Sequence, residues 1–329
     1  MTMRMAVWKS MVGALLLAAG TVPASAAGYP DRPITLFVGF SPGGGVDVVG
    51  RLLAQHLGEA LKTPVVVENK AGFSGNLAAQ QASRAPADGH TLLMTPATTY
   101  VLSQKLMGAD AVGYDLLRDF DAVSSVGEIP LVLLAKAPLD AHSLQDLAAR
   151  DKANDGTPMT YGSSGVGSIE HVAMELLREK TGQKLTHVPY KGSSPTMTDL
   201  LGGQIDLAFA TAPTALANLP SGRVSALGIT SAERSAFLQE VPTFSEQGVD
   251  DFTVASLFAL LAPKGVDAAR LQTLNEAVTA VLRKPEVVKR LADLGVTATP
   301  SSLPESAERM RREADAWNQA IDRTGISAE

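Results

Sequence analysis

The sequence predicts a two-lobed α/β protein in which each lobe holds a mostly parallel sheet flanked by helices. Three observations carry the prediction: short β-branched runs alternate with helical patterns, the alternation restarts near residue 126, and the chain ends in three helical segments. With 329 residues, 45% of them hydrophobic, the chain can bury two cores. We expect lobe 1 to comprise 27–125 and 246–329, because the chain returns to complete it, and lobe 2 to comprise 126–245.

The opening of lobe 1 follows a β-α-β-α-β order. The helix at 46–61 is indicated by Val49, Leu53 and Leu57, which repeat at helical spacing on one face. Such an order favours a parallel sheet with right-handed crossovers. Strands are predicted at 34–40, 65–68 and 90–95, and helices at 46–61 and 74–84.

The second unit and the tail repeat this alternation without a Pro-rich linker. In the last helix Met310, Ala314, Trp317 and Ile321 share one face, and Gly325 is the expected stop. Predicted strands are 131–135, 159–161, 185–188, 205–210, 224–230 and 254–262; predicted helices are 143–152, 168–180, 195–201, 266–283, 285–294 and 304–324.

Residues 1–26 have the pattern of a cleaved secretory signal peptide. Arg4 and Lys9 precede an apolar stretch at 11–20, and residues 24–26 (ASA) form a small-x-small cleavage site. The apolar stretch is about half of the ~20 residues that a membrane span needs. No cysteine follows for lipid attachment. We therefore expect a mature protein that is soluble in the periplasm.

Composition excludes several classes of function. The absence of cysteine rules out disulfides, thiolate nucleophiles and Cys-ligated metals. There are 28 basic and 34 acidic residues, and loss of the first 26 residues leaves 26 basic against 34 acidic, a net charge of −8. This balance argues against binding to nucleic acid. No metal-ligand spacing is present, and neither a metal nor a cofactor is expected.

The turn after the first strand, residues 39–47 (GFSPGGGVD), admits several interpretations. Ser41 matches a hydrolase nucleophile elbow, but Pro42 lacks the backbone N–H that the oxyanion hole needs. A dinucleotide turn from Gly43 and Gly45 would need glycine where Val48 stands. Two interpretations remain open: a cradle of backbone N–H groups for an anion, or a plain strand-to-helix turn.

A similar turn occurs in the second unit, at 161–171 (YGSSGVGSIEH). Ser163 and Ser164 add hydroxyl groups to the backbone amides, and Ser168 is a plausible N-cap. His171 lies one helical turn later, where it either lines a cleft or packs and caps. Glu170 and Glu175 do not form a metal-binding H-E-x-x-H helix. Two facing cradles would grip a molecule with a carboxylate at each end.

Many ordered motifs make the chain resemble the Bug-type, or tripartite tricarboxylate transporter (TctC-like), periplasmic substrate-binding receptors. The resemblance covers essentially the whole mature chain. Its motifs are 29–34 (YPDRPI), 41–47 (SPGGGVD), 65–72 (VVVENKAG), 75–76 (GN), 88–93 (DGHTLL), 187–192 (HVPYKG), 200–206 (LLGGQID), 241–244 (VPTF) and 261–265 (LAPKG).

The resemblance implies a type II periplasmic binding fold that closes like a venus flytrap on a small carboxylate, such as a dicarboxylate or an aromatic acid. It further implies a monomer that performs no catalysis and delivers its ligand to a membrane transporter with one large and one small subunit. The ligand-binding residues that it implies are Ser41, Gly43, Gly44, Gly45, Asp47, Ala97, Thr98, Ser163, Ser164, Gly165, Gly167, Ser168, His171 and Thr211, with Ala97 and Thr98 in a loop.

Three departures from the family pattern predict a less polar or less crowded pocket. Val46 stands where many relatives have Ser or Thr, Ala210 where some have Asp, and Leu257 at an aromatic position. No relative's substrate can therefore be copied to this chain. Two alternatives to the transport receptor remain: a sensor receptor for a signalling partner, and an exported serine hydrolase that uses Ser41 or a loop serine.

Overall fold

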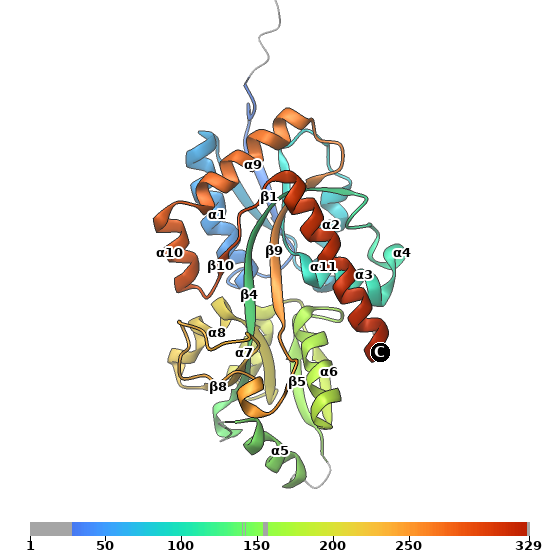
Figure 1. Ribbon diagram of the computed structural model, residues 1–329, viewed down its shortest axis with the longest axis vertical. Coiled ribbons are helices and arrows are strands. Elements are labelled where there is room, and N and C mark those ends of the chain that lie inside the picture. Colours follow the sequence, from blue (N-terminus) through green and yellow to red (C-terminus); the bar gives the residue numbers. More distant parts are fainter. Residues whose placement is uncertain (1–27, 140, 142, 154–156, 328–329) are drawn as a thin grey trace, which may run out of the picture.

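The computed structural model describes residues 28–327 apart from 140, 142 and 154–156, so the predicted signal peptide lies outside the described residues. Figure 1 shows two lobes joined by the long strands β4 (Phe120–Lys136) and β9 (Ala255–Pro263), which run side by side from one lobe into the other. This architecture confirms the predicted two-lobed α/β fold.

The upper lobe in Figure 1 contains β1–β3 with α1–α4 from the first part of the described chain, and α9 and α10 from its last part. In its sheet β2, β1 and β3 are parallel, and β9 pairs antiparallel with β3. Its elements are β1 (Ile34–Val38), α1 (Gly45–Leu61), β2 (Val65–Asn69), η1 (Phe73–Gly75), α2 (Asn76–Ser83), β3 (Thr91–Pro96), α3 (Ala97–Met107), α4 (Ala109–Val112), α9 (Ala268–Leu282), α10 (Pro285–Asp293), β10 (Thr297–Ala298) and α11 (Leu303–Thr324).

The lower lobe is built on a second parallel arrangement, in which β7, β5 and β6 lie in that order. Helices α6 and α7 follow β5 and β6, as the alternation of the sequence predicts. Its elements are η2 (Ala137–Leu139), α5 (Leu144–Ala153), β5 (Met159–Ser163), α6 (Ile169–Thr181), β6 (Leu185–Pro189), α7 (Ser193–Leu201), β7 (Leu207–Thr211), α8 (Ala212–Asn218), η3 (Leu219–Ser221), β8 (Val224–Ile229) and η4 (Ser245–Gln247).

Strand β4 belongs to both lobes. Residues 120–130 pair with β9, whereas residues 131–136 pair with β7 and β8. The pairing with β9 shifts register between Ala122 and Ser124 and again between Ser125 and Gly127. The sequence predicts only 131–135 as a strand, and the expected boundary at 125/126 falls inside β4. The division into residue ranges stays a prediction.

Helix α11 links the two cores. Ser302 and Glu305 form a capping box at its start, and Gly325, with φ 67°, ends it as predicted. Trp317 packs against the hydrophobic cores of both lobes, and Ile321 is buried in the lower one. The apolar face that the sequence indicates thus holds the helix across both lobes.

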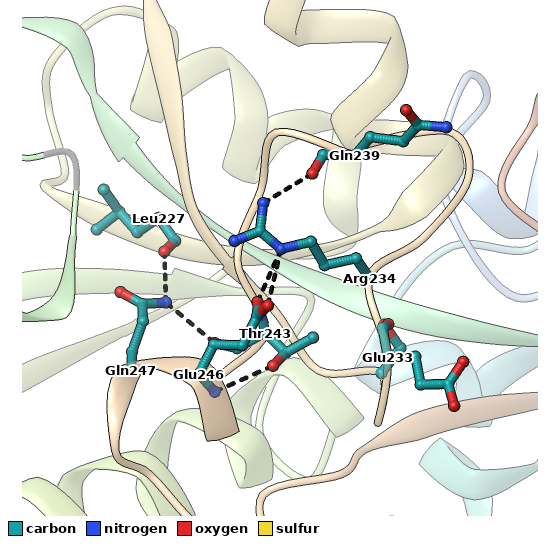
Figure 2. A network of polar contacts seen from close by, with 8 residues as sticks. Leu227, Glu233, Arg234, Gln239, Thr243, Glu246 and Gln247 are labelled. Carbon is teal, nitrogen blue, oxygen red and sulfur yellow. Dashed lines mark hydrogen bonds and ion pairs between the residues drawn. The ribbon is translucent and has the colours of Figure 1, made fainter.

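The segment between β8 and β9 is held by polar contacts (Figure 2). Arg234 Nε contacts both Glu246 carboxylate oxygens at 2.9 Å, and its Nη1 donates to the Gln239 carbonyl. Gln247 Nε2 donates to the Leu227 carbonyl at 2.9 Å, which joins the segment to β8. These contacts fix the segment on the lower lobe.

Among the described residues, no helix combines the length and apolarity that crossing a bilayer requires.

Candidate functional site

The cleft between the lobes is closed in this structure and leaves a cavity of only about 10 Å³, room for about one water molecule. Both lobes and the crossing strand β9 line it, through Phe40, Gly45, Val46, Pro96, Thr99, Ile169, Glu170, Ser193, Thr211, Ser256 and Phe258. A second, smaller cavity, too tight to hold a water molecule, is lined by Ser164, Glu170, Ser193, Thr196, Met197, Phe209 and Ala210. Neither lining contains Lys, Arg or His, so charge recognition there depends on amides, hydroxyls and one carboxyl.

The first predicted turn leaves the start of α1 uncapped. The N-cap residue Gly44 has no side chain to accept from the first-turn N–H groups, which have no partner within a helix. The Asp47 carboxylate turns back and accepts from Gly43 N at 2.9 Å. Gly45 and Val46, whose N–H groups belong to this first turn, line the larger cavity. An anion there would meet free amide donors and the positive end of the helix dipole.

Asp47 is 2% exposed and supports the turn. Besides Gly43, its carboxylate accepts from Arg51 Nε at 2.9 Å and from Asn69 Nδ2 at 2.8 Å. Burial opposes ionisation of the carboxyl, but hydrogen bonds from Arg51, Gly43 and Asn69 hold the pKa of Asp47 below its usual value. Of the residues predicted in this turn, only Gly45 lines a cavity.

The second predicted turn satisfies its own backbone donors. Gly165 N donates to Ser163 Oγ at 3.1 Å, and Gly167 N donates to His171 Nδ1 at 3.3 Å. At the start of α6, the N-cap Ser168 accepts from His171 N, and Ile169 N donates across the cleft to Thr99 Oγ1 at 3.2 Å. These partners leave few amides for a ligand.

Three aromatic rings stack behind the second turn. His171 and His187 lie with ring centroids 4.2 Å apart, and Tyr161 stacks on His187 at 4.8 Å and lies 6.5 Å from His171. Burial lowers the pKa of each histidine to about 4, so both are neutral near pH 7. His171 therefore packs and accepts from the turn, which is one of the two roles open from the sequence, and neither histidine lines the cavities.

Ser163 also lies in this layer. Its Oγ is 2.7 Å from His187 Nε2 and donates to the Gly165 carbonyl, and the side chain is 1% exposed. Although a serine next to a histidine is the beginning of a nucleophilic pair, Ser163 lines neither cavity. Its contacts hold the turn against the ring stack.

Glu170 is the most distinctive residue of the cleft, and sequence reasoning considered it only as a metal ligand. It is 5% exposed and lines both cavities. Ser164 Oγ donates to its Oε2 at 2.7 Å, and its own backbone N–H and Ser168 also donate to the carboxylate. Burial raises the pKa of Glu170, while these three donors oppose the rise. The feature of the sequence that could have indicated this role is an acidic residue in the first turn of a predicted helix.

The predicted loop at Ala97 and Thr98 is instead the start of α3. Thr98 Oγ1 donates to Glu313 and accepts from Leu257 N, so it ties α3 to α11 and β9. Thr99, one residue later, lines the larger cavity. The expectation of a loop was wrong because the Thr-rich sequence here has weak helix propensity that packing overrides.

Strand β9 presents Ser256 and Phe258 to the cavity. Leu257, which the sequence assigned to the aromatic position, lies on the opposite face because side chains alternate along a strand. Ser256 is 0% exposed, and its Oγ has no hydrogen-bond partner. A buried, unpartnered hydroxyl that lines a cavity is a mark of a binding site.

Three predicted site glycines accommodate the opposite lobe. A Cβ at Gly45 would lie 2.3 Å from Thr211 Oγ1, one at Gly165 2.3 Å from Ser74 Oγ, and one at Gly167 3.0 Å from Ser103 Cα. Ser74 Oγ donates to the Val166 carbonyl at 2.6 Å, and Ser194 Oγ to the Pro42 carbonyl at 2.9 Å. The lobes therefore meet directly at both turns.

Of the predicted site residues, the structure brings Gly45, Ser164 and Thr211 to the two cavities. The others lie in the turns behind them or at the closure surface, and a ligand role for any of them stays a prediction. Among the described residues, no group of three or more His, Asp or Glu side chains is placed to hold a metal ion.

The two lobes and the cavity between them define a periplasmic binding protein of the two-lobed type. The model of the tripartite tricarboxylate transporter family receptor matches residues 49–326, and the chain belongs to this family.

Relatives cover nearly the whole chain. The protein BugT of Bordetella pertussis is 35% identical over 317 residues, which are 96% of this chain and 97% of BugT. The structure of Rpa4515 from R. palustris with adipate has a TM-score of 0.85 at 31% identity and covers 91% of this chain and 99% of that one. MatC of Rhodopseudomonas palustris with bound malate has a TM-score of 0.81 at 29% identity, covering 89% and 100%.

Proposed function

We propose that this chain is a periplasmic receptor that captures a small organic acid between its lobes and delivers it to a membrane transporter with one large and one small subunit. Family membership supports the receptor role, and the acids bound by Rpa4515 and MatC support the class of ligand. The receptor acts as a monomer and needs neither cofactor nor metal.

The observation that carries the proposal is the uncapped start of α1 on an interlobe cavity. The N–H groups of Gly45 and Val46 face no acceptor within the helix, and Ser256 Oγ, in the lining of the same cavity, has no partner. A carboxylate bound there accepts from these donors, and the helix dipole stabilises its charge. Because the apolar lining excludes water, these donors are worth more than they would be at a surface.

We infer binding without chemistry. Pro42 after Ser41 offers no backbone N–H for an oxyanion, and the Ser163–His187 pair lines neither cavity. The contacts between Ser74 and Val166 and between Ser194 and Pro42 join the lobes on the two sides of the cleft. Hinge closure around a ligand is the function that such contacts serve.

The test is a thermal-shift screen of the mature protein after removal of co-purified ligand by unfolding and refolding. Ligand binding raises the melting temperature, since it stabilises the native state by RT ln(1 + [L]/Kd). We expect at least one carboxylate to raise it and to be recovered unchanged by mass spectrometry. No shift with any mono- or dicarboxylate would overturn the proposal, and recovery of a hydrolysed ligand would favour the hydrolase.

A variant localises the ligand. Ser256→Ala removes the unpartnered hydroxyl from the cavity wall, and we expect about tenfold weaker binding with no loss of melting temperature. Thr299→Val is the matched control, because Thr299 Oγ1 is also buried without a partner but lines neither cavity. Equal affinities in both variants would place the ligand elsewhere.

Delivery is tested by uptake. Cells that lack this chain are expected to lose uptake of the labelled acid and to regain it when wild type, but not Ser256→Ala at limiting ligand, is supplied. Uptake that is unaffected, together with loss of a transcriptional response to the acid, would support the sensor role instead.

A further inference from the structure

The two halves of the cleft differ in whether a carboxyl group of the protein is already present. At α1 the first-turn amides are uncapped and line the larger cavity. At α6 the carboxylate of Glu170 lies in the corresponding position, where Ser164, Ser168 and its own N–H donate to it. The protein's own side chain thus occupies the place that a ligand carboxylate would take at the second helix.

The position of Glu170 makes it part of the ligand site. It is 5% exposed, and it lies at the junction of the two cavities, both of which it lines together with Ser193. No lining residue carries a positive charge that could neutralise it. Any ligand that separates the lobes and extends from α1 toward the smaller cavity therefore passes this carboxyl.

We propose that Glu170 is a specificity-determining residue that restricts the ligand to one carboxylate and binds a hydrogen-bond donor, a hydroxyl or an ammonium group, on the same molecule. This inference rests on the proposed receptor function. The ligand carboxylate lies at the start of α1 near Ser256, and the donor group lies against Glu170. The receptor therefore takes hydroxy or amino acids in preference to dicarboxylates.

Electrostatics gives the reason. Two carboxylates a few Å apart in a dry cavity repel strongly, and one of them must take up a proton before both can stay. A ligand hydroxyl or ammonium instead donates a hydrogen bond to an unused lone pair of the Glu170 carboxylate, and an ammonium also neutralises its charge. The expectation of a carboxylate at each end of the ligand is replaced by a carboxylate at one end only.

The remaining lining residues determine the polarity of the middle part of the ligand. Phe40, Val46 and Phe258 contribute apolar surface to the larger cavity, and Met197, Phe209 and Ala210 contribute it to the smaller one. An apolar segment between the carboxylate and the donor fills this lining, since burial of apolar surface is favourable.

The experiment uses acids of matched length that differ only at the far end: hexanoate, 6-hydroxyhexanoate, 6-aminohexanoate and adipate, with the butanoate and octanoate sets of the same design. Affinities are measured by calorimetry on ligand-stripped wild type, Glu170→Gln and Glu170→Ser. Glu175→Gln is the control, since it removes a carboxylate from the same helix outside both cavities. Melting temperature confirms that each variant is folded.

Wild type and Glu175→Gln are expected to bind the hydroxy or amino acid at least about tenfold tighter than the dicarboxylate, and tighter than the unsubstituted acid. Glu170→Gln and Glu170→Ser are expected to invert this preference. Tighter binding of the dicarboxylate by wild type, or an unchanged preference in both Glu170 variants, would overturn the inference and leave the receptor function standing. Failure of every acid in every set would overturn both.

Discussion

The two strand–turn–helix segments of the cleft look alike in sequence and differ in how their backbone donors are used. Both are rich in glycine and serine, and both follow a strand that points into the cleft. At 39–47 the N-cap is Gly44, and the start of α1 has no side-chain cap. At 161–171 the N-cap is Ser168, and hydroxyls, a histidine and Glu170 take up the donors.

The difference teaches that a Gly/Ser turn is not by itself an anion site. Whether the backbone donors stay free for a ligand depends on the N-cap residue and on the acidic residue in the first helical turn. Asp47 turns away to Gly43, Arg51 and Asn69 and leaves the α1 amides free, whereas Glu170 stays at the start of α6. One turn is open to a ligand, and the other presents a carboxylate to it.

The largest expected difference between the turns is in their response to acid. Burial lowers the pKa of both His171 and His187, behind the second turn, to about 4. Arg178 lowers the pKa of His171 further. His171 lowers that of His187, and Glu175 opposes this second effect. The unfolded chain binds protons that the native state does not, so stability is lost as pH falls from about 6.5 toward 4. Each histidine can remove up to about 1.4 kcal/mol per pH unit from the free energy of unfolding.

Asp47 in the first turn affects the free energy of unfolding in a different pH range. Its pKa is lowered, so its contribution is complete above about pH 4 and is lost only below it. Urea unfolding from pH 7 to 4.5 should show a fall in stability that is shallower in His187→Gln and unchanged in slope in Asp47→Asn. Equal slopes for wild type and His187→Gln would mean that the histidines are protonated in the native state.

The next largest expected effect is on ligand affinity, when a side chain is added at the first turn where it contacts the other lobe. In Gly45→Ala the new Cβ would lie 2.3 Å from Thr211 Oγ1. Thr211 is only 4% exposed, and its Oγ1 is hydrogen-bonded to Thr214 Oγ1, so it has little room to move away. We expect ligand affinity to fall by at least about tenfold because the lobes cannot close fully, with little change in the stability of the ligand-free protein.

Gly58→Ala is the control in the same helix. Its Cβ would meet Thr63 O at 3.5 Å, an ordinary contact, and alanine stabilises a helix interior by about 0.5–1 kcal/mol relative to glycine. Calorimetry and thermal unfolding separate the two variants. An affinity for Gly45→Ala equal to that for Gly58→Ala would show that Thr211 yields and that closure tolerates the side chain.

The smallest expected effect comes from giving the first turn the cap that the second has. Gly44 has φ −75° and ψ 164°, which serine adopts readily, and serine at an N-cap stabilises a helix by only a few tenths of a kcal/mol over glycine. Gly44→Ser should leave stability almost unchanged and weaken ligand binding severalfold, because its hydroxyl competes for the α1 amides.

Ser168→Ala is the reciprocal variant. It removes the cap from α6 and should cost about 1 kcal/mol of stability with a smaller effect on affinity. Thermal unfolding and calorimetry on both variants test the comparison directly. If Ser168→Ala weakened binding more than Gly44→Ser, the ligand carboxylate would lie at the second turn.

Much of the fold was predictable because its periodicities are strong. The alternation of strands and helices and the apolar faces of α1 and α11 are visible in the sequence. Helix α3 was missed because its Thr-rich start has weak propensity and owes its form to burial. The first half of β4 was missed because Ser124, Ser125, Gly127 and Pro130 interrupt the apolar run. The first three lie at register shifts that only the pairing with β9 explains.

The site was predictable to the level of the two turns. Of the predicted residues, Gly45, Ser164 and Thr211 line the cavities, whereas Ser256 and Thr99 reach them from elements brought there by the crossing strands and by closure, and their ligand roles stay predictions. Leu257, the predicted departure at an aromatic position, lines neither cavity, because side chains alternate along a strand and its neighbours Ser256 and Phe258 face the larger one. The role of Glu170 depended on its burial between two cavities, which no spacing encodes.

The shared strand β4 also limits how the gene can be divided. Cutting the chain at 125/126 and at 245/246 would leave β9 without half of its pairing with β4 and the lower lobe without a complete β4. Trp317 and Ile321 of α11 would be separated from the lower core in the same operation. Domain swaps between relatives should therefore exchange the residues that line the cavity and keep both crossing strands with their own terminal helix.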